Sequence, residues 1–369
     1  MTKIALTGAG GFLGFHLRAA ARTFGMQTVG IPLGEGFDVD QATAALDGAA
    51  AIIHLAGVNR GTDQEVTEGN HLFAEQLATS LQGAHQPPAR LVYANSIQAT
   101  NGSLYGTAKS RAAEALATQA RRLGIAFEDV RLPNLFGEYG RPFYNSVVAT
   151  FSHLTACGQQ PKVLEDKELQ LLHAQTAAEI LLDITPVAEL YNLSQCETVT
   201  GVKNLLEEFH ELYAAGEFPD LSTTFRRDLF NTYRSYTFPD HAPLNIQQHA
   251  DQRGTFFEVV RSHGGTGQTS FSSTAPGVTR GEHFHRRKVE RFTVVAGEAE
   301  IQLRRLFDHR IFRYRISGDE PKSVDMPTLY THNITNVGDE TLYTAFWTND
   351  IFDPNNPDTI AETVACENA

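Results

Sequence analysis

The sequence predicts an α/β protein with a doubly wound parallel sheet, followed by an all-β sandwich or barrel. The first half alternates short apolar runs with helical segments, the pattern of a parallel sheet that is buried on both faces. A glycine-rich turn joins its first apolar run to its first helix. From about residue 244 the sequence pattern changes to short strand-like segments between Gly- and Asp-containing turns, with no strong helix signal.

The first half reads as strand, helix and strand in turn. The predicted elements are the strand 4–6, the helix 14–24, the strands 28–31, 51–55 and 90–94, and, as the last clear helix before the change of texture, 202–215. The predicted strands of the second half are 255–260, 291–295, 299–303, 310–315 and 341–346.

The Pro-marked segment 238–243 is the natural junction between these two textures. A chain of 369 residues is too long for one comfortable core, since domains usually hold roughly 100–200 residues. We therefore expect a domain at 1–243 and a second at 244–369.

Charge and cysteine content exclude several classes of function. The net charge of −13 disfavours non-specific binding to nucleic acid or to an anionic membrane. No charged-then-apolar leader is recognised, and no apolar stretch approaches the roughly 20 residues that span a bilayer. Cys157, Cys196 and Cys366 form no motif and are odd in number, which argues for a reducing compartment. We expect a cytoplasmic protein without a nucleic-acid or membrane partner.

The glycine-rich turn spans Thr7 to Gly14 and is typical of a Rossmann-like dinucleotide site. Gly8 would allow the tight turn, Gly11 would let the backbone approach the pyrophosphate, and Gly14 would let helix and sheet pack closely. The pyrophosphate would sit on the helix N-terminus, beside Phe12 and Leu13. A glycine triplet can also be a purely structural turn, but here the required strand precedes it and a helix follows.

Tyr105 and Lys109 form a Tyr-x-x-x-Lys pair, which places both side chains on one face of a helix. A lysine ammonium beside a tyrosine lowers the pKa of the phenol, so the tyrosine can exchange a proton with a carbonyl oxygen while hydride moves. Ser96, at the end of a predicted strand, would steady the same oxygen. The pair also occurs by chance, but behind a glycine-rich turn it favours catalysis.

Residues 1–243 resemble the extended short-chain dehydrogenase/reductase family. His54-Leu55-Ala56-Gly57 is similar to the segment that runs beside the cofactor, and Arg131 to Gly137 to the nucleotide-sugar segment. The resemblance implies that Leu55, Ala56 and Gly57 contact the cofactor, and that Asn134 contacts the sugar-nucleotide diphosphate. A turn-capping role is the alternative for Asn134.

Two features depart from that family. The interval between Ser96 and Tyr105 is short, which bears on the serine assignment. The second strand ends without the acidic residue that binds the NAD ribose, and no arginine follows to bind a 2′-phosphate. Asp38 and Val39 are the candidates for contact with the adenine.

In the C-terminal half, the spacing of Gly277, His283, His285, Glu290 and Gly297 matches the first motif of the cupin (jelly-roll) family. The segment 327–336, which includes His332, matches the second, except that Leu329 replaces the usual glycine. Imidazoles two apart on a strand point to the same face, and neighbouring strands can close the shell. Three histidines and a carboxylate suit Zn, Mn, Fe or Ni, with Zn as the first choice.

Residues 251–258 and 279–284 resemble the substrate segments of nucleotide-4-ketosugar 3,5-epimerases. This resemblance implies that Arg253 or Arg280 holds the diphosphate, and that His283 lies where those metal-free enzymes keep their base. A metal-bound imidazole cannot serve as a free base. If a metal is bound, Lys288 or a tyrosine such as Tyr330 must move the proton, unless Lys288 lies on the solvated surface.

The whole chain resembles the bifunctional capsular-polysaccharide enzymes of the CapF type. The segments that carry this resemblance are 54–60, 96–100, 133–137, 144–147, 331–334 and 352–355. It implies that the cupin epimerises C3 of a UDP-2-acetamido-2,6-dideoxy-4-hexulose and that the reductase then delivers hydride from NADPH, or from NADH, to C4. The product would be UDP-2-acetamido-2,6-dideoxy-L-talose, a UDP-N-acetyl-L-talosamine-type sugar on the route to UDP-N-acetyl-L-fucosamine. The enzyme would be a homodimer.

Two other functions remain open at this point. One is a nucleotide-sugar reductase whose cupin is a non-catalytic binding or dimerisation module. The other is a regulatory nucleotide sensor, in which Tyr105 and Lys109 would be expendable. Proton exchange at C3 of the 4-keto sugar would distinguish the first alternative from the bifunctional enzyme.

Overall fold

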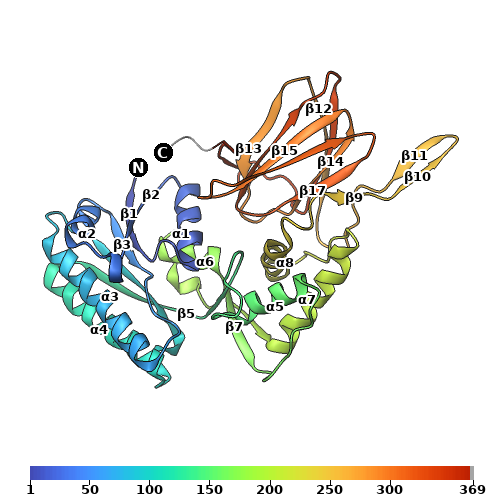
Figure 1. Cartoon of the computed structure of the whole chain (residues 1–369). Helices are drawn as coiled ribbons and strands as arrows, with labels where there is room; N and C mark the ends of the chain where they lie inside the picture. The colour runs from blue at the N-terminus through green and yellow to red at the C-terminus, as the bar shows by residue number, and fades with distance from the viewer. Residues whose placement is uncertain (366–369) are drawn as a thin grey trace. The chain divides into compact units, whose positions relative to one another are not determined.

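The computed structural model describes residues 1–365, so that Cys366 lies outside the described residues. The chain forms two compact units (Figure 1). The first comprises residues 1–150 and 165–199, and the second comprises 151–164 and the chain from residue 200 onward.

The first unit is built on a five-stranded parallel sheet with the order β2-β1-β3-β4-β5. Its strands are β1 Lys3–Thr7, β2 Gln27–Ile31, β3 Ala51–His54, β4 Arg90–Ser96 and β5 Ala126–Leu132. The helices that connect and cover them are α1 Phe12–Thr23, α2 Val39–Leu46, α3 Asp63–Gly83, α4 Leu104–Leu123 and α6 Ala174–Leu181. A smaller sheet of β6 Asn134–Phe136, β7 Glu168–His173 and β8 Gln195–Thr198 completes the unit.

Both faces of the parallel sheet are covered, which is why its strands read as continuous apolar runs. Leu6 and Ile53 pack into a core with α1 and α6, whereas their neighbours Ala5 and Ile52 pack into a second core with α2, α3 and α4. Figure 1 shows α3 and α4 along one face of this sheet. The predicted doubly wound α/β fold is confirmed.

The second unit contains two five-stranded sheets, with the orders β12-β19-β14-β17-β9 and β16-β15-β18-β13-β20. Within each sheet, neighbouring strands pair antiparallel, as expected of a cupin. The strands are β9 Leu244–Asn245, β12 Gln268–Thr274, β13 Thr279–Phe284, β14 Glu290–Ala296, β15 Glu298–Arg305, β16 Ile311–Ser317, β17 Lys322–Met326, β18 Tyr330–Asn336, β19 Leu342–Thr348 and β20 Ile360–Ala361.

The strand predicted at 255–260 is shorter than expected and lies outside both sheets. It is β11 Gly254–Phe257, which pairs antiparallel with β10 Gln248–Asp251 in a separate two-stranded hairpin. Figure 1 shows this hairpin projecting from the rest of its unit. The alternation of residues that indicates a strand therefore did not indicate which sheet the strand would join.

The division between the units differs from the boundary predicted after residue 243. Helices α7 Val199–Ala214 and α8 Thr224–Thr237 belong almost entirely to the second unit, although the sequence analysis assigned them to the reductase domain. The physical reason is that aromatic and charged side chains join these helices to the β-strands of the second unit. Phe218, between these helices, stacks on Trp347 of β19 with ring centroids 4.5 Å apart, and Arg234 of α8 donates to the carbonyl of Met326 at 2.7 Å.

The compact unit that contains the β-sheets also includes 151–164 and the chain from residue 200, so the fragment from residue 244 alone is only part of that unit. Among the described residues, no helix is long and apolar enough to span a membrane.

Candidate functional site

The glycine-rich turn brings the backbone of β1 and α1 into contact. Gly8 has a positive φ of 68°, and a Cβ at Gly14 would overlap the carbonyl oxygen of Gly8, so both positions require glycine. Gly11 is the N-cap of α1 and has no side chain with which to cap the first amides of the helix. These amides can therefore face an anion, as the pyrophosphate prediction requires.

The segment after β3 is fixed next to this turn by a side chain that sequence reasoning missed. The hydroxyl of Thr7 accepts hydrogen bonds from the amides of Leu55 and Ala56 at 3.1 and 3.2 Å. A Cβ at Gly57 would lie 4.0 Å from Nζ of Lys109, which brings the predicted cofactor segment beside the predicted catalytic lysine.

Asn70 of α3 holds the other end of this loop. Its side-chain amide donates to the carbonyls of Val58 and Val66 at 2.9 and 2.7 Å. A polar side chain among the apolar positions of α3 was the available signal, because buried amides are retained where they satisfy backbone groups.

Lys109 is buried, and two contacts within the first unit hold its ammonium group in place. Nζ donates to the carbonyl of Ala94 at 2.8 Å and lies 4.1 Å from the centre of the Tyr93 ring. Burial lowers the pKa of Lys109 to about 7.

The pKa of Tyr105 moves opposite to the prediction. Burial, with a smaller contribution from Tyr144, raises the pKa of Tyr105 to about 12, so the expected lowering by Lys109 is not found. Burial raises the pKa because a buried phenolate loses the hydration of its charge. The phenol is therefore protonated near neutral pH and can act as a proton donor.

Ser96 ends β4, and its hydroxyl accepts a hydrogen bond from the amide of Gln98 at 3.2 Å. The turn of α4 that carries Tyr105 packs directly against this segment. A Cβ at Gly106 would overlap the carbonyl oxygen of Gln98. The short interval between Ser96 and Tyr105 is thus accommodated by close backbone packing at Gly106, a position that the sequence analysis did not single out.

We expect Gly106→Ala to slow hydride transfer by about 10²-fold, because displacement of a catalytic group by about 1 Å costs that much. Cofactor affinity should stay near that of the unmodified protein, since the glycine-rich turn is untouched. Single-turnover reduction and fluorescence titration of the cofactor measure the two quantities. Arg111→Ala, on the exposed side of α4, is the control, and an unimpaired Gly106→Ala enzyme would contradict the argument.

The remaining predicted residues of the first unit lie at element ends. Asn134 opens β6, where its side-chain amide donates to the carbonyl of Gln170 at 3.2 Å. Asp38 is the N-cap of α2 and accepts from the amide of Gln41 at 3.0 Å, while Val39 is exposed. Their contacts with substrate and cofactor stay predictions.

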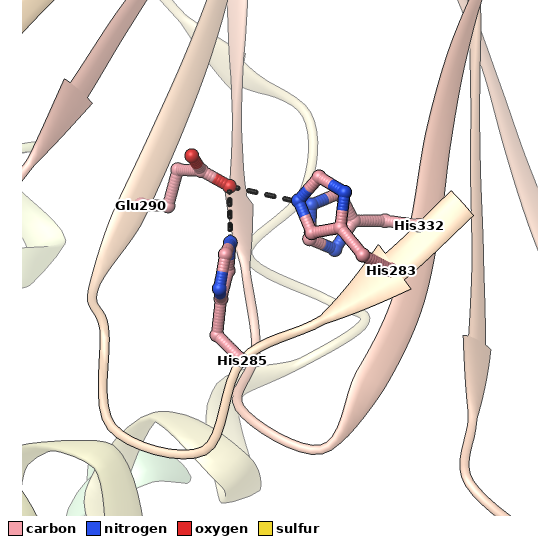
Figure 2. A group of neighbouring side chains, drawn as sticks. All are labelled: His283, His285, Glu290 and His332. Carbon is pink, nitrogen blue, oxygen red and sulfur yellow. Dashed lines mark hydrogen bonds and ion pairs between the residues drawn. The ribbon is translucent and has the colours of Figure 1, made fainter. Parts of the chain in front are cut away.

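The four predicted metal ligands of the second unit come together (Figure 2). The candidate ligand atoms of His283, His285, Glu290 and His332 all lie within 4.8 Å of one another. Strands β13 and β18 pair so that His283 and His332 are direct neighbours, and Glu290 begins β14. Because β14 belongs to the other five-stranded sheet, the cluster that the spacing predicts combines ligands from both sheets.

The electrostatics of this cluster fit a divalent metal. Oε2 of Glu290 lies 3.1 Å from Nε2 of His285 and 3.3 Å from Nε2 of His332. Burial and the adjacent His332 and His285 lower the pKa of His283 to about 3, which keeps this imidazole neutral. Although burial opposes it, interaction with His285 and His332 holds the pKa of Glu290 well below its ordinary value.

Nε2 of His332 is buried, and among the described residues its polar neighbour is Oε2 of Glu290 at 3.3 Å, an ion-pair distance without the geometry of a hydrogen bond. Three imidazoles and one carboxylate together form the donor set of a Zn-type site, and a bound metal would satisfy this buried imidazole nitrogen.

Leu329, which stands where the second cupin motif usually has glycine, has a backbone conformation that favours glycine. Its φ is 63°, in the left-handed region that L residues rarely adopt, and its amide donates to the carbonyl of His285 at 2.8 Å. The departure in sequence thus does not disrupt the ligand cluster.

A cavity of about 300 Å³ opens beside the ligands, a size in the range of small-molecule sites. Arg280, His283, Lys288 and Glu290 line it, together with aromatic side chains such as Phe292. Lys288 is 7 % exposed, so its alternative placement on the solvated surface is wrong. The ammonium of Lys288 donates to the carbonyl of Pro357.

Two predicted residues lie away from this cavity. Arg253 is on the β10–β11 hairpin, where its side chain is 90 % exposed and pairs with Asp251. Tyr330 is buried edge-on against the ring of Phe238 and does not line the cavity. Of the two candidate arginines, only Arg280 faces the cavity in the described structure.

Known proteins resemble this chain along nearly its whole length. A curated relative from Pseudomonas aeruginosa, named UDP-2-acetamido-2,6-beta-L-arabino-hexul-4-ose reductase, is 32% identical and the match covers 98% of this chain and 99% of the relative. The crystal structure of the capsular polysaccharide assembling protein CapF from Staphylococcus aureus is 33% identical, with a TM-score of 0.62, over 98% of this chain and 99% of that one. The chain belongs to the CapF family of capsular-polysaccharide enzymes.

Other proteins match only part of this CapF-family chain, or match it in a structure with a bound inhibitor. The family model described as polysaccharide biosynthesis C-terminal domain matches residues 249–360, a range that contains the whole ligand cluster. The spore coat polysaccharide biosynthesis protein SpsL from Bacillus subtilis is 26% identical over 31% of this chain and 81% of its own. A structure of CapF with the inhibitor 3-isopropenyl-tropolone is 30% identical, with a TM-score of 0.54, over 98% of this chain and 100% of that one.

Proposed function

We propose that this CapF-family chain epimerises C3 and then reduces C4 of a UDP-2-acetamido-2,6-dideoxy-4-hexulose. The product is UDP-2-acetamido-2,6-dideoxy-L-talose, a precursor of UDP-N-acetyl-L-fucosamine. The chain matches a 4-hexulose reductase over 98% of its length. The observation that carries the proposal is that this chain has two sites with complementary chemistry. One holds a protonated tyrosine beside a nucleotide turn, and the other a histidine cluster beside a cavity.

Reduction is assigned to the first unit. A bound nicotinamide would supply the hydride for C4, and the phenol of Tyr105 would donate its proton to the C4 oxygen, which becomes a hydroxyl group. The raised pKa of Tyr105 supports this direction, since the donor must carry its proton before the reaction. Lys109, which lies beside the predicted cofactor segment at Gly57, would contact the cofactor, and Ser96 would steady the carbonyl oxygen. NADPH is the proposed cofactor, with NADH as the second choice.

Epimerisation is assigned to the second unit and must come first. A C4 ketone acidifies the proton at C3, so the proton can leave and return on the other face only before reduction removes the ketone. Lys288 is the proposed proton carrier, because it lines the cavity whereas Tyr330 does not, and because His283 belongs to the ligand cluster. Arg280, on the wall of the same cavity, would pair with the diphosphate.

A divalent metal, Zn first, would be held by His283, His285, Glu290 and His332. When bound, it would supply Lewis-acid stabilisation of negative charge on the substrate oxygens. The tropolone inhibitor of the related CapF supports the proposal, since tropolones carry adjacent oxygens that chelate divalent metals.

We further propose a cytoplasmic homodimer. The exposed thiols of Cys157 and Cys196 suit a reducing compartment. The edge strand β12 carries the exposed Phe271, which a second copy of the chain would cover. Light scattering measures the mass of the protein in solution and tests for the dimer. We also propose that Arg253, on the exposed hairpin, contacts the substrate.

The proposal is tested with the full-length protein and the 4-keto sugar in heavy water. Without nicotinamide, NMR should detect deuterium at C3; on addition of NADPH, the C4 alcohol with L-talo configuration should form. Reduction without prior exchange at C3 would favour the alternative of a reductase with a non-catalytic cupin. Parallel reactions with NADPH and NADH determine the cofactor preference.

We expect Lys288→Met to slow deuterium uptake at C3 by a factor of about 10²–10⁴, the usual cost of removing a general acid or base. Metal content should not change, because Lys288 is not a member of the ligand cluster. Lys322→Met, which alters a lysine of β17 outside the cavity, is the matched control. Unchanged uptake in Lys288→Met would show that another group moves the proton.

A further inference from the structure

The C-terminal segment of the chain runs alongside the ligand cluster of the second unit. Strand β20 pairs with β13 so that Ala361 is opposite His283 and Ile360 is opposite Phe284. Asp358 lies two residues before the start of this strand, is buried, and has a φ of 45°. A buried aspartate in a left-handed conformation close to a candidate metal site requires a physical explanation.

The carboxylate of Asp358 binds the turn that carries the ligands. Oδ1 accepts a hydrogen bond from the amide of Arg286 at 3.0 Å, and Oδ2 accepts from the amides of Arg287 and Lys288, both at 2.9 Å. These three residues lie in the turn between His285 and Glu290. One side chain thus satisfies three consecutive backbone donors and fixes the shape of the turn.

The main chain of Asp358 acts on a ligand directly. Its carbonyl oxygen accepts a hydrogen bond from Nδ1 of His285. A carbonyl oxygen only accepts, so Nδ1 carries the proton of this bond and Nε2, which lies 3.1 Å from Oε2 of Glu290, is the ring nitrogen that would coordinate a metal. A carbonyl that binds the far nitrogen of a histidine sets both the tautomer and the ring orientation that coordination needs.

We propose that Asp358 is the positioning residue of the metal site. It couples the C-terminal segment to three groups at once: the imidazole of His285, the backbone that places Glu290, and the backbone of Lys288. The inference rests on the proposed function in assuming that the cluster binds a metal. Neither the cupin motifs nor the quoted resemblances include Asp358, which lies 73 residues after His285.

The test uses two variants that keep the backbone conformation. Asn adopts positive φ readily and has the shape of Asp, but it has one acceptor oxygen in place of two, and its NH₂ group would face a backbone donor. Gly also accepts this φ and removes all three side-chain hydrogen bonds. Asp353→Asn is the matched control, because Asp353 is exposed and caps only its own turn, at the amide of Asn355.

Metal affinity of the full-length protein is measured by competition with a chromogenic zinc chelator, and metal content by elemental analysis. Asp358→Asn should bind Zn²⁺ about 10–100-fold more weakly than the unmodified protein, the usual cost of losing such an outer-shell partner, and Asp358→Gly at least as weakly. Excess Zn²⁺ should restore the rate of C3 exchange in the Asn variant, which mere misfolding would not allow. Asp353→Asn should retain full affinity.

The outcomes separate this inference from the proposed function. Unchanged zinc affinity in either folded Asp358 variant overturns the role of Asp358 and leaves the metal site standing. A lack of zinc binding by the unmodified protein overturns both. Weaker binding that excess Zn²⁺ does not rescue would assign Asp358 to the general stability of the turn instead.

Discussion

Replacing Tyr105 by phenylalanine should remove C4 reduction and leave C3 exchange intact. Removal of a general acid typically lowers the rate by about 10²–10⁴-fold, because the oxyanion must then take its proton from water. Burial of Tyr105 strengthens the expectation, since its environment disfavours a charged phenolate and keeps the proton on the oxygen. Oxidation of NADPH measures reduction, and deuterium uptake by NMR measures exchange in the same sample.

The control for this variant is Tyr191→Phe, which removes the hydroxyl of an exposed tyrosine in the same unit. It should reduce the substrate at the rate of the unmodified protein. Near-normal reduction by Tyr105→Phe would contradict the assignment. Loss of both activities would instead indicate that the substitution perturbs the whole chain.

The unmodified protein should contain one divalent metal per chain, and His285→Ala and His332→Ala should each lose it. Both imidazoles lie within 3.3 Å of Oε2 of Glu290, so removal of either leaves an incomplete ligand set. Deuterium uptake at C3 should fall by at least about 10²-fold, since a bound cation stabilises transition-state charge by several kcal/mol. Elemental analysis and NMR provide the two measurements.

His309→Ala is the matched control, because His309 is an exposed histidine of the same unit. It should retain both metal and exchange. Full metal occupancy in both ligand variants would refute the site. Loss of metal with exchange preserved would mean that the metal is structural, and the epimerase chemistry would then have to depend on Lys288 and the cavity alone.

The sequence by itself determined the parts of each site that are close together along the chain. The α-helix period brings Tyr105 and Lys109 to one face, and the alternation of side chains at the end of β13 brings His283 near His285, the first residue after the strand. The requirement for glycine at Gly8 and Gly14 was also readable, because it follows from a strand, a tight turn and a helix in succession. In each case a few residues of local geometry fix the distance, so the prediction needs no knowledge of the rest of the fold.

The tertiary structure decided everything that depends on which surfaces pack together. It moved α7 and α8 to the second unit through Phe218 and Trp347, buried Lys288, and left Arg253 on an exposed hairpin. It also brought Asp358 to the turn beside His285 across 73 residues. Periodicity indicates which face of an element is apolar but not which partner covers it, because that choice depends on long-range packing summed over the unit. The pKa of Tyr105 was mispredicted for the same reason: desolvation depends on burial, which a spacing of four residues does not contain.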